Sequence, residues 1–313
     1  MSASAGKVVI AALVGNFLIA LTKFTAASIT GSSAMLSEGV HSLVDTGNQA
    51  LLLLGMKRAK RPASPGFPFG HGKEIYFWSF MVAVLLFGFG AGISIWEGVK
   101  HVMHPVEMVK PTIAYIVLGV SIVFEGVSFT VALLEFNKVR NGLGYFEAAN
   151  RGKDPTFFVV LFEDSAAMIG LIVALLGVVL SQVTGNPIWD GIASIVIGLV
   201  LAVVAIWLAR ETKGLLIGES ADEMVTEKIR NSATAHSEID NVNEIATLHM
   251  GPNFIVVNMS LDFADSLNSR QLESLVTTLS NEIKAIDPSI KRVFIEAESR
   301  ANHTLANSDL ASD

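Results

Sequence analysis

The sequence of 313 residues contains no cysteine, and only 16% of its residues are charged. Without thiols the chain can form neither a disulfide nor a thiolate zinc site, so any transition-metal site must use His, Asp, Glu or backbone oxygens. The net charge of −7 argues against a nucleic-acid partner, because neutralising phosphates requires clustered Lys and Arg. No His-Glu-x-x-His motif is present, and no nucleophile stands out with its base, so the sequence does not indicate an enzyme.

Apolar residues are abundant instead, at 51% of the chain, and the mean hydropathy is +0.53. Soluble domains carry about 25% charged residues, so much of this chain is expected to be solvated by lipid. A bilayer core of about 30 Å requires about 20 predominantly apolar residues per helix. The stretches that meet this requirement are roughly Val8 to Ile29, Ser33 to Met56, Ile75 to Trp96, Thr112 to Phe136, Phe157 to Val183 and Ile188 to Ala209. We therefore predict a membrane all-α bundle of six transmembrane helices over residues 1–210.

The charge of the connections predicts the orientation of these spans, because Lys and Arg near span ends favour the cytoplasmic side. Basic residues lie before the first span and after the second, fourth and sixth, whereas the opposite connections hold only Lys100 and Lys110. Both termini are therefore predicted to be cytoplasmic. We expect a multi-pass integral membrane protein of the bacterial inner (plasma) membrane.

The character of the sequence changes after Arg210. Residues 211–299 read as helix, strand, strand, helix and strand, with the strands near 241–249, 254–263 and 292–298. This order predicts a small cytoplasmic α+β domain of ferredoxin-like type (α-β-β-α-β), and docking to a second copy would give it a larger core. Residues 300–313 are rich in Asn, Ser, Asp and Ala, and are predicted to be a disordered tail.

Polar residues inside the predicted spans carry the functional information, because each is costly in lipid. In the second span His41 and Asp45 are four residues apart and lie on one helix face, which Glu38 extends. The fifth span contributes Glu163 and Asp164. An imidazole and two carboxylates, from His41, Asp45 and Asp164, suit zinc or a similar ion with a fourth position open for Glu163, Glu38 or water. The alternative is that His41 and Asp45 form a buried structural pair.

Other polar residues allow two readings each. Lys23 in the first span can line a path or extend to the interface, and Glu125 in the fourth span can stand beside the metal ligands or carry protons. Asp190 is equally a helix-start residue or a functional one. His101 and His104, in a predicted external loop, are either weak metal collectors or a solvated pair.

Several motifs in order carry a resemblance to a known family. The first two spans contain Thr30-Gly31-Ser32-Ser33-Ala34 and then the run from Glu38 to Asp45, EGVHSLVD. The first cytoplasmic loop ends in Phe69-Gly70-His71-Gly72-Lys73-Glu74, and six spans precede an α+β domain. In these features the chain resembles the cation diffusion facilitator transporters up to about residue 299. Its Glu163-Asp164-x-Ala-Ala run is most similar to the zinc-transporter branch with mitochondrial members and bacterial relatives.

The resemblance implies a homodimeric metal/proton antiporter that works by alternating access. Its transport site, carried over residue by residue, is His41, Asp45 and Asp164. The family's fourth ligand stands four residues before Asp164, where this chain has Val160, which cannot bind metal. Glu163 is the obvious substitute, although it lies about 100° around the helix from Asp164. His71 matches the histidine of the family's loop site, whose upstream partners are absent here.

The sequence and the resemblance together predict export of a divalent transition-metal cation, zinc first, from the cytoplasm in exchange for protons. His41 favours a borderline ion such as zinc over manganese. Manganese, iron or cobalt remain alternative cargoes, and a metal-binding channel or sensor is an alternative function. The expected partners are the metal ion, protons, the lipid bilayer and a second copy of the chain. No cofactor beyond the transported metal is expected.

Overall fold

The computed structural model describes residues 3–140 and 142–310. The chain divides into two compact units, each described below by itself. The helical unit comprises Met1–Arg58 and Ile75–Lys213, and the sheet unit comprises Ala59–Glu74 and Gly214–Asp313. The predicted boundary at Arg210 falls inside the last long helix, which continues to Ile217.

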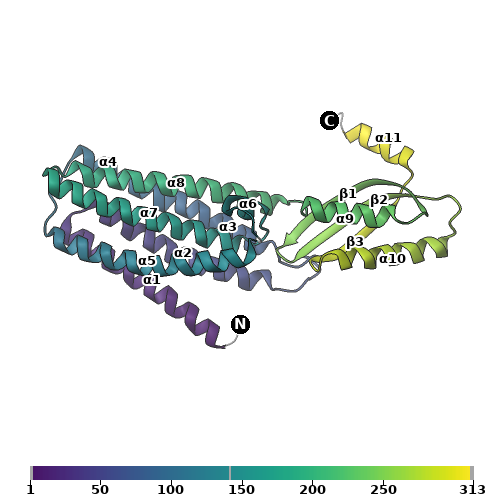
Figure 1. Cartoon of the computed structure of the whole chain (residues 1–313), viewed down its shortest axis with the longest axis horizontal. Helices are drawn as coiled ribbons and strands as arrows, with labels where there is room; N and C mark the ends of the chain where they lie inside the picture. The colour runs from purple at the N-terminus through teal and green to yellow at the C-terminus, as the bar shows by residue number, and fades with distance from the viewer. Residues whose placement is uncertain (1–2, 141, 311–313) are drawn as a thin grey trace. The chain divides into compact units, whose positions relative to one another are not determined.

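In the helical unit, long helices run roughly side by side (Figure 1). The helical elements are, in chain order, α1 (Ala3–Thr30), α2 (Ser33–Ala59), α3 (Glu74–Leu85), the π-helical turn η1 (Leu86–Ala91), α4 (Gly92–Met103), α5 (Pro111–Val139), the short α6 (Tyr145–Arg151), α7 (Pro155–Thr184) and α8 (Ile188–Ile217). The α1–α2 turn passes through Gly31, whose φ of 71° favours glycine. α7 begins with a proline after Asp154, whose side chain accepts the Thr156 N–H, and ends at a left-handed Gly185.

Among the described residues, four helical stretches are long and apolar enough to cross a membrane. They are Glu74–Met103, Pro111–Val139, Pro155–Thr184 and Ile188–Ile217. The first two expected spans correspond to α1 and α2, helices of 28 and 27 residues that are not in this set. In α2 the polar residues of the predicted site lower the hydropathy of the helix.

Apolar side chains cover an outer face of the helical unit. On α5, Val123, Val127, Val131 and Leu134 recur every three or four residues and are all more than half exposed. Polar side chains such as Lys23, by contrast, are fully buried. This distribution is the reverse of that in a soluble protein and suits a lipid surrounding.

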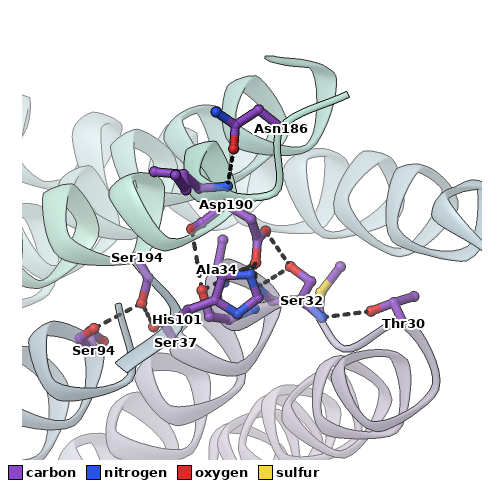
Figure 2. A network of polar contacts seen from close by, with 12 residues as sticks. Thr30, Ser32, Ala34, Ser37, Ser94, His101, Asn186, Asp190 and Ser194 are labelled. Carbon is purple, nitrogen blue, oxygen red and sulfur yellow. Dashed lines mark hydrogen bonds and ion pairs between the residues drawn. The ribbon is translucent and has the colours of Figure 1, made fainter. Parts of the chain in front are cut away.

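The start of α2 is held by a carboxylate from another helix (Figure 2). Asp190, in the first turn of α8, accepts hydrogen bonds from the Ser32 hydroxyl at 2.6 Å and from the Ser33 N–H at 2.5 Å. The Ala34 N–H lies 3.4 Å from the same carboxylate. Asp190 therefore caps the N-terminus of α2 although it lies 157 residues further along the chain. Its place in the first turn of α8 did not reveal this structural role.

Hydroxyl groups extend this network to α4 (Figure 2). The Ser37 and Ser194 hydroxyls are 2.5 Å apart, and Ser194 donates to the Ser94 carbonyl at 2.8 Å. His101 was expected in an external loop, but it lies in the last turn of α4 and is only 9% exposed. Its Nε2 is 3.9 Å from an Asp190 oxygen. The network fixes the N-terminal end of α2, and therefore the position along the helix axis of the polar residues that follow on this helix.

The sheet unit contains α9 (Glu223–Thr234), β1 (Ile239–Gly251), β2 (Phe254–Phe263), α10 (Ser269–Ile286), β3 (Ile290–Ala297) and α11 (Arg300–Leu310). Among the described residues the sheet has the order β1-β2-β3, with β1 antiparallel and β3 parallel to β2. Val257, Met259 and Leu261 of β2 are fully buried against Leu279 and Ile283 of α10. The predicted order of helix, strand, strand, helix and strand is present.

Two segments of the sheet unit differ from the prediction. The loop before α3 belongs to this unit: Phe69 packs edge-on against Phe254 and Phe294, with ring centroids 6.4 Å away in both cases. The segment predicted to be a disordered tail is helical over Arg300–Leu310, and 311–313 lie outside the described residues. Its start is capped, because Asp262 accepts the Arg300 N–H and Ser299 accepts an N–H one turn on.

We expect Asp190→Ala to destabilise the protein by about 1–3 kcal/mol, because the N–H and hydroxyl donors at the start of α2 lose their buried acceptor. Thermal unfolding of the purified protein in detergent measures the effect. The matched control is Asp240→Ala, which removes an exposed carboxylate from β1. Equal melting temperatures for the two variants would contradict the capping role.

Candidate metal site

The predicted stripe on α2 is buried, and its central pair is in contact. His41 is fully buried, and its Nδ1 lies 3.4 Å from Oδ1 of Asp45, one turn further on. Neither ring nitrogen of His41, nor this Asp45 oxygen, has a hydrogen-bond partner among the described residues. Two ligands bound to tetrahedral zinc at about 2.0–2.1 Å lie about 3.4 Å apart. The separation and the missing partners both suit a shared cation.

The two adjacent acids of α7 point to different neighbours. Asn48 of α2 donates to Glu163 at 2.7 Å, whereas Ser128 of α5 donates to Asp164 at 2.9 Å. Successive residues on a helix are separated by about 100°, which explains the divergence. Asp164 thus lies at the α5–α7 contact, and Glu163 lies against α2.

A buried ion pair joins α1 to the first turns of α2. Lys23 of α1 donates to Glu38 at 3.0 Å and to Ser42 at 2.8 Å, and both charged side chains are fully buried. Gly170 of α7 leaves room for the pair, since a Cβ there would lie 2.5 Å from the second Glu38 oxygen. Lys23 therefore does not extend to an interface, and Glu38 already has a cationic partner.

The charge of this region is strongly one-sided. Glu125, Glu163 and Asp164 all lie near enough to Asp45 for their charges to repel its own, whereas the Lys23 ammonium attracts it, and Glu125 is also near Asp164 and Glu38. Carboxylates in a medium of low dielectric repel one another unless they are protonated or neutralised. Lys23 compensates one of them, so the others require protons or a bound cation.

The structure brings some of the predicted residues together and not others. His41 and Asp45 are in contact, and Asp164 and Glu163 lie in the same region. Among the described residues, no three His, Asp or Glu side chains are close enough to hold a metal ion. His71 belongs to the sheet unit, where its ring lies tilted at 39° to the ring of Phe67, with centroids 4.5 Å apart.

Two cavities lie beside the site. One of about 540 Å³ lies between α1 and α5, and Asn16, Ile19, Ser121, Glu125 and Ser128 are among its lining residues. A second, of about 10 Å³, is lined by Asn16, Ile19, Ser42, Asp45 and Glu125. It is about the size of one water molecule. Three residues line both cavities, so polar groups continue from the α1–α5 cleft to Asp45.

Sequence reasoning missed the partners of these acids rather than the acids themselves. Asn48 donates a hydrogen bond to Glu163, Ser128 donates one to Asp164, and Lys23 is the buried cation that pairs with Glu38. The available signal was spacing. Glu125 and Ser128 are three residues apart and share one face of α5, as His41 and Asp45 share one face of α2.

The chain matches a family model described as the cation efflux transmembrane domain over residues 9–217. It is 33% identical over 285 residues to the proton-coupled zinc antiporter SLC30A9, mitochondrial, of Xenopus laevis, covering 90% of this chain and 51% of that protein. It is 34% identical over 259 residues to metal tolerance protein C4 of Arabidopsis thaliana (82% and 57%). It is 20% identical over 298 residues to the manganese efflux system protein MneP of Bacillus subtilis (92% and 94%). The chain spans about half the length of the first two.

We expect Lys23→Met to lower the stability of the protein by about 3–5 kcal/mol, because it leaves Glu38 buried without its cation. The double variant Lys23→Met with Glu38→Gln should recover most of the loss, since no uncompensated charge remains. Thermal unfolding in detergent measures both. A double variant that is less stable than the single one would show that the charge of Glu38 is not the cause.

Proposed function

We propose that this chain, which belongs to the cation efflux family, carries a divalent transition-metal ion, zinc first, across a bilayer in exchange for protons. One observation carries the proposal: His41 is fully buried beside Asp45 in a region crowded with carboxylates, and neither of its ring nitrogens has a hydrogen-bond partner among the described residues. Buried polar groups are normally satisfied, and imidazole with carboxylates is a ligand set for zinc.

The ligands proposed for the ion are His41, Asp45 and Asp164. Binding requires Asp164 to exchange its contact with Ser128 for the ion, because no three ligands converge among the described residues. Asp45 and His41 already have the separation of two ligands on one ion. A side-chain rotation on α7, or a shift of α7 against α5, supplies the third ligand.

Proton exchange follows from the charge of the site. A carboxylate binds metal only when ionised and an imidazole only when neutral, so metal binding releases protons. When the ion leaves, protons must return because the carboxylates cannot stay ionised together in a low dielectric. Alternating exposure of the site to the two sides then couples the flow of metal to the opposite flow of protons.

The proposed setting is a six-span protein of a bacterial inner membrane with cytoplasmic termini, which works as a homodimer. At 1.5 Å per residue the 28 and 27 residues of α1 and α2 are about 40 Å long, more than the roughly 30 Å of a bilayer core. Several of their polar residues, Lys23, Glu38, His41 and Asn48 among them, are fully buried in the helical unit, as in spans that line a transport path.

Manganese is the second candidate cargo. Most of the possible ligands in the region are carboxylate oxygens, which suit manganese, whereas the imidazole of His41 favours zinc. The Bacillus subtilis relative is named as a manganese efflux protein. Competition between the two ions for uptake decides between them.

Zinc uptake into proteoliposomes tests the proposal. We expect uptake to require an imposed pH gradient, and Asp45→Asn and Asp164→Asn each to lower the initial rate at least ~10-fold, because each removes an anionic ligand. Glu135→Gln is the matched control, since it neutralises a half-exposed carboxylate on α5 that pairs with Lys138.

Uptake that is unchanged in both Asp variants would refute the site. Uptake by the native chain that is equally fast without a pH gradient would refute antiport and favour a channel.

A further inference from the structure

The departure at Val160 leaves α7 with Asp164 but no second donor one turn earlier on the same face. A site of three ligands can be completed by water, but the region holds other acids. Two of these are already engaged: Glu163 accepts from Asn48 at 2.7 Å, and Glu38 is paired with Lys23 at 3.0 Å. Neither can bind a metal ion without breaking a buried contact.

Glu125 of α5 is differently placed. It lines the cavity of about 10 Å³ together with Asp45 and Ser42, so the two acidic residues border the same small cavity. It also lies one turn before Ser128, the residue that holds Asp164. Its charge acts on both Asp45 and Asp164. No hydrogen bond to its carboxylate is found among the described residues.

We infer that Glu125 is a metal ligand of the transport site and supplies from α5 the donor that α7 lacks at Val160. The inference rests on the proposed function and deepens it. His41 is fully buried beside the same aspartate, and neither of its ring nitrogens has a hydrogen-bond partner in the part of the chain that the structure describes, which independently indicates a ligand at this place. The ion would then bind to His41, Asp45, Glu125 and Asp164, from three helices rather than two.

This arrangement has a mechanical consequence. α5 packs against both α1 and α7, and Glu125 lines both the large α1–α5 cavity and the small cavity. Glu125 can therefore bind an ion in the large cavity and remain bound to it when the ion reaches Asp45. Movement of α5 against α2 then changes the coordination, so this helix takes part in the exchange.

Zinc affinity of the purified full-length chain in detergent, measured by isothermal titration calorimetry, tests the inference. We expect Glu125→Gln, which keeps the size and removes the donor charge, to raise the Kd for zinc at least ~10-fold. Glu125→His supplies an imidazole and should return the Kd to within about 3-fold of the native value, with a preference shifted from manganese towards zinc. Glu135→Gln on the same helix should bind zinc as the native chain does.

The outcomes separate this inference from the proposed function. If Asp45→Asn weakens zinc binding and Glu125→Gln does not, the inference is overturned and the transport site stands. If Glu125→Gln and Glu125→His weaken zinc binding equally, Glu125 acts through its charge alone and is not a ligand, which overturns the inference. If the native chain binds no zinc or manganese, the proposed function fails as well. A native Kd with loss of proton-driven uptake in Glu125→Gln would make Glu125 a proton carrier and overturn ligation.

Discussion

The buried contact between Lys23 and Glu38 is the interaction on which the arrangement of the helical unit depends. An ion pair that is wholly out of water persists only when its geometry is good and the remaining polar atoms are accommodated. Here Ser42 takes a second lysine contact, and Gly170 gives the carboxylate space against α7. The pair therefore joins α1 to α2 and sets how closely α7 can approach them.

The same constraint sorts the polar groups of the site into two kinds. Glu163 and Asp164 have neutral hydrogen-bond donors, from Asn48 and Ser128 respectively, which tie α7 to α2 and α5. Among the described residues, neither ring nitrogen of His41 nor the Asp45 oxygen beside it has a hydrogen-bond partner, and one oxygen each of Glu38 and Asn48 also lacks one. The hydrogen-bonded groups hold the helices together, and in the proposed function a cation or a proton is the missing partner of the His41–Asp45 pair.

The contacts at the N-terminus of α2 determine the position of these groups along the helix bundle. Asp190 accepts the first N–H groups of α2. The hydroxyls of Ser37 and Ser194 and the backbone carbonyl of Ser94 continue the contact between α2, α8 and α4. A helix held at its N-terminus by a charge, and in its second turn by the Lys23–Glu38 ion pair, has little freedom to slide. In the proposed transport cycle, movement of α5 and α7 around a fixed α2 would open and close the site.

The sequence by itself determined the features that depend on near neighbours. The four-residue spacing of His41 and Asp45 places them on one helix face, and alternation and turn residues predicted the order of elements in the sheet unit. Only the tertiary structure decided the partners. Lys23 meets Glu38, and Asp190 meets Ser33, because helices far apart in the sequence pack together. The helix at Arg300–Leu310 likewise depends on a cap from β2. Periodicity is a property of one segment, whereas pairing of buried charges depends on how segments pack, which composition and spacing do not specify.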